Sequence, residues 1–157
     1  MKEQLSFLAY LLGWWTVRTL PEKSAYSLFY WIGEFAHRKN GKSIQRLRAN
    51  LHQVKPNLNS EELEVLVAEA MSSYMRYWCD TFRIQDWSLE RVRKTVTTSN
   101  DHLLLEPMHD GRGVVVALPH SGNWDHAGAY FCSLGIPLVT VAERLKPEAL
   151  FQKFLRH

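Results

Sequence analysis

The feature that most constrains the fold is a pair of short apolar runs, VVVAL (residues 114–118) and PLVTVA (residues 137–142). An unbroken apolar run of this length is typical of a strand buried on both faces of a parallel sheet. Between them, the sequence from about Asn123 to Leu134 has a helical pattern that ends at Gly135. Strand, helix and strand in about 30 residues form a βαβ unit, so we expect residues 92–157 to begin an α/β core with a parallel sheet.

The sequence before this core predicts helices. After Pro21, apolar residues recur at spacings of three and four, which indicates a helix with one apolar face. These residues are Ala25, Leu28, Phe29, Ile32 and Phe35. Two more helices are predicted, one over residues 43–54 and one from a capping Ser60 through Phe82. We therefore expect residues 1–91 to form an N-terminal helical part.

The predicted sheet is too small to be complete. Two or three strands make a poor parallel sheet, because such sheets normally have several strands with helices on both faces. The chain also ends at His157 on charged, helix-like sequence. We expect the 157 residues to be the N-terminal part of a longer protein, and to form one truncated domain.

Charge and cysteine content narrow the classes of partner. The formal charge of +3 is too small to indicate a nucleic-acid partner, and none is expected. Positive charge is concentrated between Glu34 and Glu61, where no acidic residue occurs; the basic residues there are Arg38, Lys39, Lys42, Arg46, Arg48 and Lys55. A solvated helix face and contact with anionic lipid headgroups both fit this pattern. Cys79 and Cys132 form no CxxC motif, which favours a reducing compartment.

The uncharged residues 5–17 (LSFLAYLLGWWTV) are too few to cross a bilayer, which needs about 20. They also lack the small-x-small cleavage site of a signal peptide. Trp14 and Trp15 lie close to Arg18, an arrangement that suits a helix lying at the membrane interface. A helix buried against the rest of the domain fits these residues equally well.

The polar turn after VVVAL carries the candidate chemistry. His120 stands at the carboxyl end of the first predicted strand, where ligands bind in open parallel sheets. It could act as a general base, with Asp125 fixing its tautomer and Gly122 permitting the chain reversal. Backbone N–H groups from Ser121 to Trp124 could stabilise an anion. The alternative is a polar turn whose Asn or Asp only caps a helix.

Two kinds of chemistry remain open at this turn. No serine elbow or nearby cysteine nucleophile is evident, which favours direct attack by a substrate hydroxyl that His120 deprotonates. The second possibility is a metal-dependent hydrolase, whose metal ligands would be His109, His120, Asp125 and His126. The spacing of His120 and His126 is not that of a helical metal-binding pair. We therefore expect no metal and no cofactor.

The turn also resembles a known family. HSGNWD fits the H-x4-D signature of the glycerolipid-type acyltransferases. The longer string ALPHSGNWDHAG resembles the bacterial subgroup that includes the lipid A lauroyl acyltransferases and, more closely, the phosphatidylinositol mannoside acyltransferases. The segments RLRANLHQVKPNLN, YMRYWCDTFRI and VAERLKPEALFQKF are similar to that subgroup too. The lipid A branch is less favoured, because its motif typically has Glu in place of Asp125.

The resemblance implies an enzyme that transfers a long acyl chain from acyl-CoA, its co-substrate, to a sugar hydroxyl of a glycolipid acceptor. His120 would be the general base and Asp125 its partner. The enzyme would be a peripheral protein on the cytoplasmic face of the bacterial plasma membrane. An additional acidic catalytic residue is expected beyond His157, so the 157 residues alone are expected to be inactive. The predicted substrate-binding residues are Ser121, Gly122, Asn123, Trp124, His126, Glu143 and Arg144, and the predicted membrane contacts are Trp14, Trp15, Arg46 and Arg48.

Overall fold

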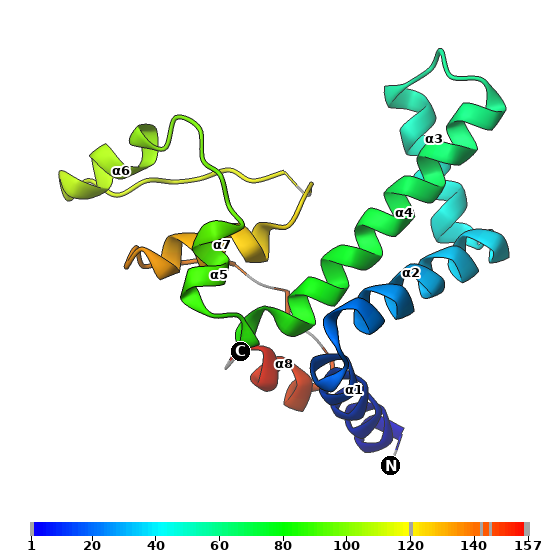
Figure 1. Ribbon diagram of the computed structural model, residues 1–157, viewed down its shortest axis with the longest axis horizontal. Coiled ribbons are helices and arrows are strands. Elements are labelled where there is room, and N and C mark those ends of the chain that lie inside the picture. The colour runs from blue at the N-terminus through cyan, green and yellow to red at the C-terminus, as the bar shows by residue number, and fades with distance from the viewer. Residues whose placement is uncertain (1, 120, 142, 145, 156–157) are drawn as a thin grey trace. The chain divides into compact units, whose positions relative to one another are not determined.

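The computed structural model describes residues 2–119, 121–141, 143–144 and 146–155. Their regular structure is helical (Figure 1). The helices are α1 (Lys2–Thr19), α2 (Glu22–Lys39), α3 (Lys42–Val54), α4 (Ser60–Arg83), the 3-10 turn η1 (Ile84–Asp86), α5 (Leu89–Lys94), α6 (His102–His109), α7 (Trp124–Ser133) and α8 (Glu148–Leu155).

The chain divides into two compact units. The first, called the helical unit here, contains the described residues of 1–85 and 143–157, and the second, the turn unit, contains those of 86–142. The first boundary falls at residue 85, and α8 groups with the N-terminal helices.

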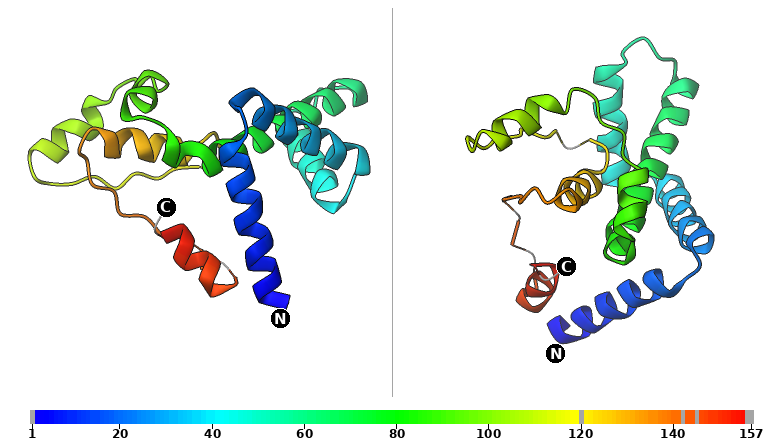
Figure 2. Two further views of the ribbon diagram at one scale, coloured as in Figure 1. Left: turned by 60° about the horizontal axis from the view of Figure 1, so that its bottom comes forward. Right: turned by 60° about the vertical axis from the view of Figure 1, so that its left-hand side comes forward.

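The helical unit is organised around α4, which packs against α1, α2 and α3 (Figures 1 and 2). This helix starts with a capping box in which the Asn59 side chain accepts from the Glu62 backbone N–H at 2.9 Å. The Glu62 carboxylate accepts in return from the Asn59 N–H at 2.9 Å. Asn59 is therefore the N-cap, one residue before the predicted Ser60, because its side chain satisfies an otherwise unpaired N–H group.

Two apolar clusters form the core of the helical unit. One contains Val17, Ala25, Phe29 and Cys79, and the other contains Ile44, Leu63 and Val67. Burial raises the pKa of the Cys79 thiol to about 11, which keeps this cysteine in its neutral form. Both clusters lie along α4, so this helix supplies a partner for the apolar face of each neighbouring helix.

The predicted apolar stripe of α2 divides between two faces. Ala25, Phe29 and Gly33 are buried, and a Cβ atom at Gly33 would lie 3.0 Å from Met75 Cγ, so α2 and α4 approach closely there. Leu28, Ile32 and Phe35, predicted on the same face, are exposed. The prediction of one buried stripe was wrong at these three positions, because the apolar residues of α2 cover more of its circumference than α4 can bury.

Hydrogen bonds to α1 fix its end against α4. The Arg83 guanidinium donates to the carbonyl oxygens of Val17 and Leu20, the latter at 2.9 Å. The Trp14 indole N–H donates to Phe82 O at 3.1 Å. Val17 and Phe82 lie in the last turns of α1 and α4, where carbonyl groups have no partner within the helix, and Leu20 directly follows α1.

The turn unit has a much smaller core. Val92 on α5 and Ser133 on α7 are its buried residues among those described, and the two helices pack against each other. The Arg93 guanidinium donates to Ser133 Oγ at 3.2 Å and also to the Ser133 carbonyl oxygen. A polar contact therefore contributes to the α5–α7 packing.

The predicted parallel sheet is not formed: no strand occurs in the described part of the chain. Residues 114–118 and 137–141 run as plain extended segments (Figure 1), and Val115, Val139 and Val141 are 99%, 101% and 99% exposed. The expected start of a βαβ sheet was therefore wrong for this structure. A strand needs hydrogen-bonding neighbours along its length, and the segments have none among the described residues.

A helix that crosses a bilayer needs about 20 mostly apolar residues. Among the residues described, no helix combines the length and the apolar character needed to span one.

Candidate active site at the start of helix α7

The turn before α7 has a defined backbone. Ser121 N–H donates to Pro119 O at 2.8 Å, which closes a tight turn, and Gly122 follows at φ 68°, in the left-handed region that favours glycine. The sequence prediction that Gly122 permits the chain reversal is consistent with this geometry. His120, the predicted general base, lies outside the described residues.

Asn123 has a structural role at this turn. It is the N-cap of α7, and its side-chain oxygen accepts from the His126 backbone N–H at 2.9 Å. This is the capping role that the sequence left open as an alternative. The cap orients the first turn of α7, so Asp125 lies at the positive end of the helix, half-buried.

His126 is held by two residues from outside α7. Its Nε2 lies 2.9 Å from Thr95 Oγ1, and its ring packs edge-on against Trp87 with centroids 5.1 Å apart. Thr95 is the C-cap of α5 and Trp87 precedes α5. The candidate site therefore includes both ends of the α5 segment as well as the turn before α7.

The Thr95 hydroxyl indicates which tautomer of His126 fits best. A threonine hydroxyl has one proton to donate, and Thr95 Oγ1 lies 2.9 Å from Arg91 O, a carbonyl that can only accept. If the proton is donated there, the hydroxyl accepts from His126 Nε2–H. This assignment satisfies all three groups, and in the uncharged form of the ring it makes Nδ1 of His126 the acceptor nitrogen.

Two buried donors next to His126 lack a partner. Among the described residues, Trp87 Nε1 and Asn123 Nδ2 are buried side-chain nitrogens without a hydrogen bond. The Arg91 guanidinium lies 4.1 Å from the centre of the Trp87 ring, which fixes the indole between a cation and the His126 edge. The neighbourhood of His126 thus combines one acceptor nitrogen with two unpaired donors.

Sequence reasoning missed Thr95 and Trp87. Thr95 precedes His126 by 31 positions and has no motif of its own, so only the packing of α5 on α7 brings the two together. Trp87 had no periodic signal either, because it lies between two helices.

The remaining predicted substrate-binding residues fall into two groups. Ser121 and Gly122 are exposed and Trp124 is half-buried, all close to His126 in the turn unit. Glu143 and Arg144 belong to the helical unit, where both are exposed. Arg144 Nε donates to Glu148 at 2.8 Å, and this bond lowers the pKa of the Glu148 carboxyl.

The alternative of a metal-dependent hydrolase requires several ligand side chains close together. Within the described ranges, no three His, Cys, Asp or Glu side chains are grouped closely enough to hold a metal ion. His120, a member of the predicted ligand set, lies outside these ranges.

Comparison with known proteins identifies the family. Residues 2–157 match the model of the bacterial lipid A biosynthesis acyltransferases. The chain belongs to this family. It is similar to the phosphatidylinositol mannoside acyltransferases of Mycolicibacterium smegmatis, at 36% identity over 98% of this chain and 50% of the relative, and of Mycobacterium tuberculosis, at 38% identity over 94% and 46%. The chain spans about half the length of these curated relatives.

The predicted membrane contacts of this acyltransferase family member lie in different environments. Trp15 is 63% exposed, whereas Trp14 is 5% exposed and belongs to the core. Arg46 is exposed. Arg48 is half-buried and pairs with Glu64, donating from Nη2 at 3.0 Å. Trp14 therefore has the buried environment that its sequence left open as an alternative, and the partly exposed Arg48 is engaged in an ion pair.

Proposed function

We propose that the protein transfers a long acyl chain from acyl-CoA to a sugar hydroxyl of a membrane glycolipid, in the favoured case a mannose of phosphatidylinositol mannoside. The observation that carries this proposal is the HSGNWD turn in a chain that matches the acyltransferase family over residues 2–157. The names of the two mycobacterial relatives support the choice of acceptor.

In the proposed reaction, His120 takes the proton of the attacking sugar hydroxyl. The sugar oxygen bonds to the thioester carbonyl carbon, and negative charge develops on the carbonyl oxygen near the positive end of α7. Collapse of this intermediate breaks the carbon–sulfur bond, and the coenzyme A thiolate leaves and takes up the proton. Asp125 stabilises the His120 imidazolium, and no cofactor takes part.

The proposal is tested with radiolabelled acyl-CoA and a mannosylated phosphatidylinositol acceptor, using the full-length gene product. We expect His120→Ala to lower kcat by about 10²–10⁴-fold, the usual contribution of a general base. His102→Ala, at an exposed histidine of α6, serves as the matched control and retains activity. Unchanged acyl transfer in His120→Ala contradicts the mechanism.

A lipid A acceptor is the second candidate, because the matching family is described by that acceptor. The same assay, run with a lipid A precursor in place of the mannosylated lipid, separates the two. Faster transfer to the lipid A precursor would replace the first proposal with the second.

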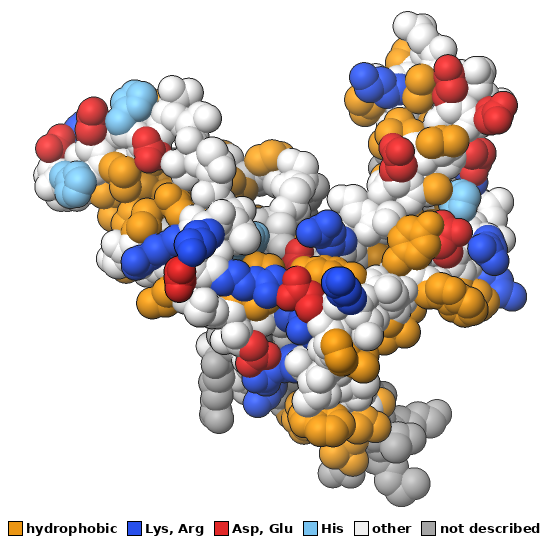
Figure 3. Space-filling model, viewed as in Figure 1, with side chains coloured by type: hydrophobic (Ala, Val, Ile, Leu, Met, Phe, Trp, Pro, Cys, Tyr) orange, Lys and Arg blue, Asp and Glu red, His pale blue; other side chains and the backbone are white. Residues whose placement is uncertain are grey.

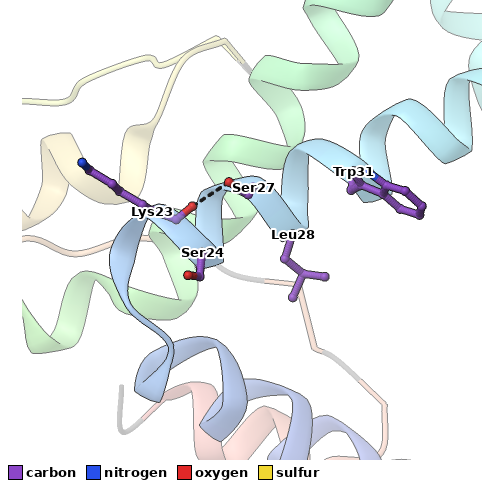
Figure 4. Close-up of a pocket in the computed structure, with 5 residues that line it drawn as sticks. All are labelled: Lys23, Ser24, Ser27, Leu28 and Trp31. Carbon is purple, nitrogen blue, oxygen red and sulfur yellow. Dashed lines mark hydrogen bonds between the residues drawn. The ribbon is translucent and has the colours of Figure 1, made fainter.

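We also propose that the protein is peripheral at the cytoplasmic face of the membrane and contacts anionic lipid through α1 and α2. Support comes from apolar side chains that follow helical spacing and remain exposed: Leu8, Leu12 and Trp15 on α1, and Leu28, Trp31, Ile32 and Phe35 on α2. Figure 3 shows hydrophobic side chains over both helices with Lys and Arg nearby, and in Figure 4 Leu28 and Trp31 project outward from α2. Exposed Trp beside basic residues is typical of interfacial helices.

Vesicle binding tests the membrane proposal. We expect co-sedimentation with anionic vesicles at low salt, and about ten-fold weaker binding for Trp31→Ser, since a large buried aromatic contributes at least this much. Val54→Ser, at an exposed valine of α3, is the control. Equal binding of Trp31→Ser and the parent protein would place the contact elsewhere.

A further inference from the structure

The helical unit contains a groove of about 590 Å³ between the end of α2, the start of α3 and the middle of α4. Its volume lies in the range of about 300–1,000 Å³ that is usual for small-molecule sites. None of the candidate active-site residues lines it.

The floor of this groove is apolar. Ile44, Leu47 and Met71 line it. Ile44 is 4% exposed and belongs to the second apolar cluster, and Leu47 and Met71 pack against that cluster. Ala70 on α4 also faces the groove, and its small side chain leaves room there. A floor of this kind favours a ligand with a hydrocarbon portion.

The rim of the groove is cationic. Lys39 and Lys42 line it, and no Asp or Glu does. The neighbouring carboxylates are occupied: Glu34 pairs with Arg38 at 3.4 Å, and Glu64 pairs with Arg48 and His37. Among the described residues, neither rim lysine has a carboxylate partner within ion-pair distance, so both ammonium groups can attract an anion.

The groove also continues the exposed apolar face of α2. The Lys39 ammonium lies 5.4 Å from the centre of the Phe35 ring, and Phe35 is 57% exposed. Lys39 therefore stands between the apolar stripe and the groove, with its charged end near an aromatic side chain, as lysines do at membrane interfaces.

We propose that this groove is a binding site for one anionic phospholipid. The headgroup phosphate pairs with Lys39 and Lys42, and one acyl chain covers Ile44, Leu47 and Met71. Charge complementarity selects this occupant: a zwitterionic lipid offers the same hydrocarbon but no net charge to the two lysines. The site does not depend on acyl transfer, since it contains none of the residues proposed for the reaction.

Binding of a monomeric short-chain lipid separates this site from general attraction to a membrane surface. Dihexanoylphosphatidylglycerol, kept below its micelle concentration, is titrated into the 157-residue chain while NMR follows the Ile44, Leu47 and Met71 methyl groups. We expect saturable shifts at these methyls, and about 25-fold weaker binding of dihexanoylphosphatidylcholine, because each of the two lysines near an anionic headgroup contributes about five-fold.

Two variant pairs assign the binding to the groove. Lys39→Gln with Lys42→Gln is expected to lower the affinity for the anionic lipid to that for the zwitterionic one. The control, Lys23→Gln with Lys55→Gln, makes the same charge change at exposed lysines outside the groove and retains the affinity. Ala70→Leu fills the groove and abolishes binding of both lipids, whereas Ala49→Leu on the exposed side of α3 does not.

Three results would overturn the proposal. The first is equal binding of the anionic and zwitterionic lipids. The second is an anionic-lipid titration that leaves the three methyl groups unshifted. The third is inorganic phosphate binding as tightly as the anionic lipid, which would assign the lysines to a phosphate site. The acyl-transfer assay measures none of these three results. The lipid-binding proposal can therefore be overturned without contradicting the proposed acyl-transfer reaction.

Discussion

The two units differ in whether their apolar segments are buried. In the helical unit, Ala25 and Val67 are fully buried because α2 and α3 each pack against α4 and each helix satisfies its own backbone hydrogen bonds. In the turn unit, the equally apolar residues 114–118 remain exposed. An apolar helix needs only a neighbouring surface, whereas an apolar strand also needs hydrogen-bonding partners along its edges.

The largest expected effect is on the free energy of unfolding, when the loss of a buried apolar side chain in the helical unit is compared with the loss of an exposed one in the turn unit. Phe29→Ala removes an 8% exposed ring from the first apolar cluster and should lower the free energy of unfolding by about 3–5 kcal/mol. Val115→Ala removes a fully exposed side chain and should change it by less than about 0.5 kcal/mol. Urea unfolding followed by circular dichroism measures both.

The comparison fails if Val115→Ala is as destabilising as Phe29→Ala. That outcome would show that residues 114–118 are buried in solution, as their sequence predicts. Val54→Ala, at a valine of α3 that is 73% exposed, gives the reference for an exposed apolar residue in the helical unit.

The same contrast explains what the sequence could predict. The helices and their approximate limits followed from local spacing, because a helix is determined by residues three and four apart. The side of α2 that is buried did not, since Leu28 and Phe29 are both apolar and only the position of α4 separates them. The prediction of strands was wrong, because an apolar run indicates a segment that could join a sheet but does not identify the strands with which it would pair.

In the candidate site, too, the local features could be predicted from the sequence and the contacts between distant residues could not. The turn, its cap and the location of Asp125 and His126 in the first turn of α7 could be predicted from a contiguous motif. Thr95 and Trp87 could not, because their contact with His126 comes from the packing of α5 on α7. Trp14 was ambiguous in sequence, as an indole suits both a core and a membrane interface.

A polar contact in the helical unit should have the next largest effect. Arg83→Met keeps most of the side-chain volume but removes the donors to Val17 O and Leu20 O, which would then lack these bonds. We expect a loss of about 2–3 kcal/mol in the free energy of unfolding, measured with urea. Arg46→Met, at an exposed arginine of α3, should change it little.

In the turn unit, Thr95→Val should have a smaller effect on stability and a specific effect on His126. Loss of one partly exposed hydrogen bond costs about 1 kcal/mol. Without the Thr95 oxygen, the Nε2–H tautomer loses its acceptor, and ¹⁵N chemical shifts of the neutral ring should report a mixture of tautomers. Thr95→Ser retains the hydroxyl and should retain the parent spectrum. A parent spectrum in Thr95→Val would contradict the assigned tautomer.

The smallest effect concerns the ion pair that joins α3 to α4. The hydrogen bond from Arg48 holds the pKa of the Glu64 carboxyl below its usual value of about 4.3. A carboxyl with a lowered pKa contributes stability that is present above its unfolded-state pKa and is lost as pH falls through the folded one. Glu64→Gln should therefore flatten the loss of stability below about pH 4.3, by a modest amount because Glu64 is 44% exposed. Glu69→Gln, at an exposed glutamate of the same helix, should keep the parent slope, and identical slopes for both variants would mean that the Arg48–Glu64 pair does not stabilise the fold.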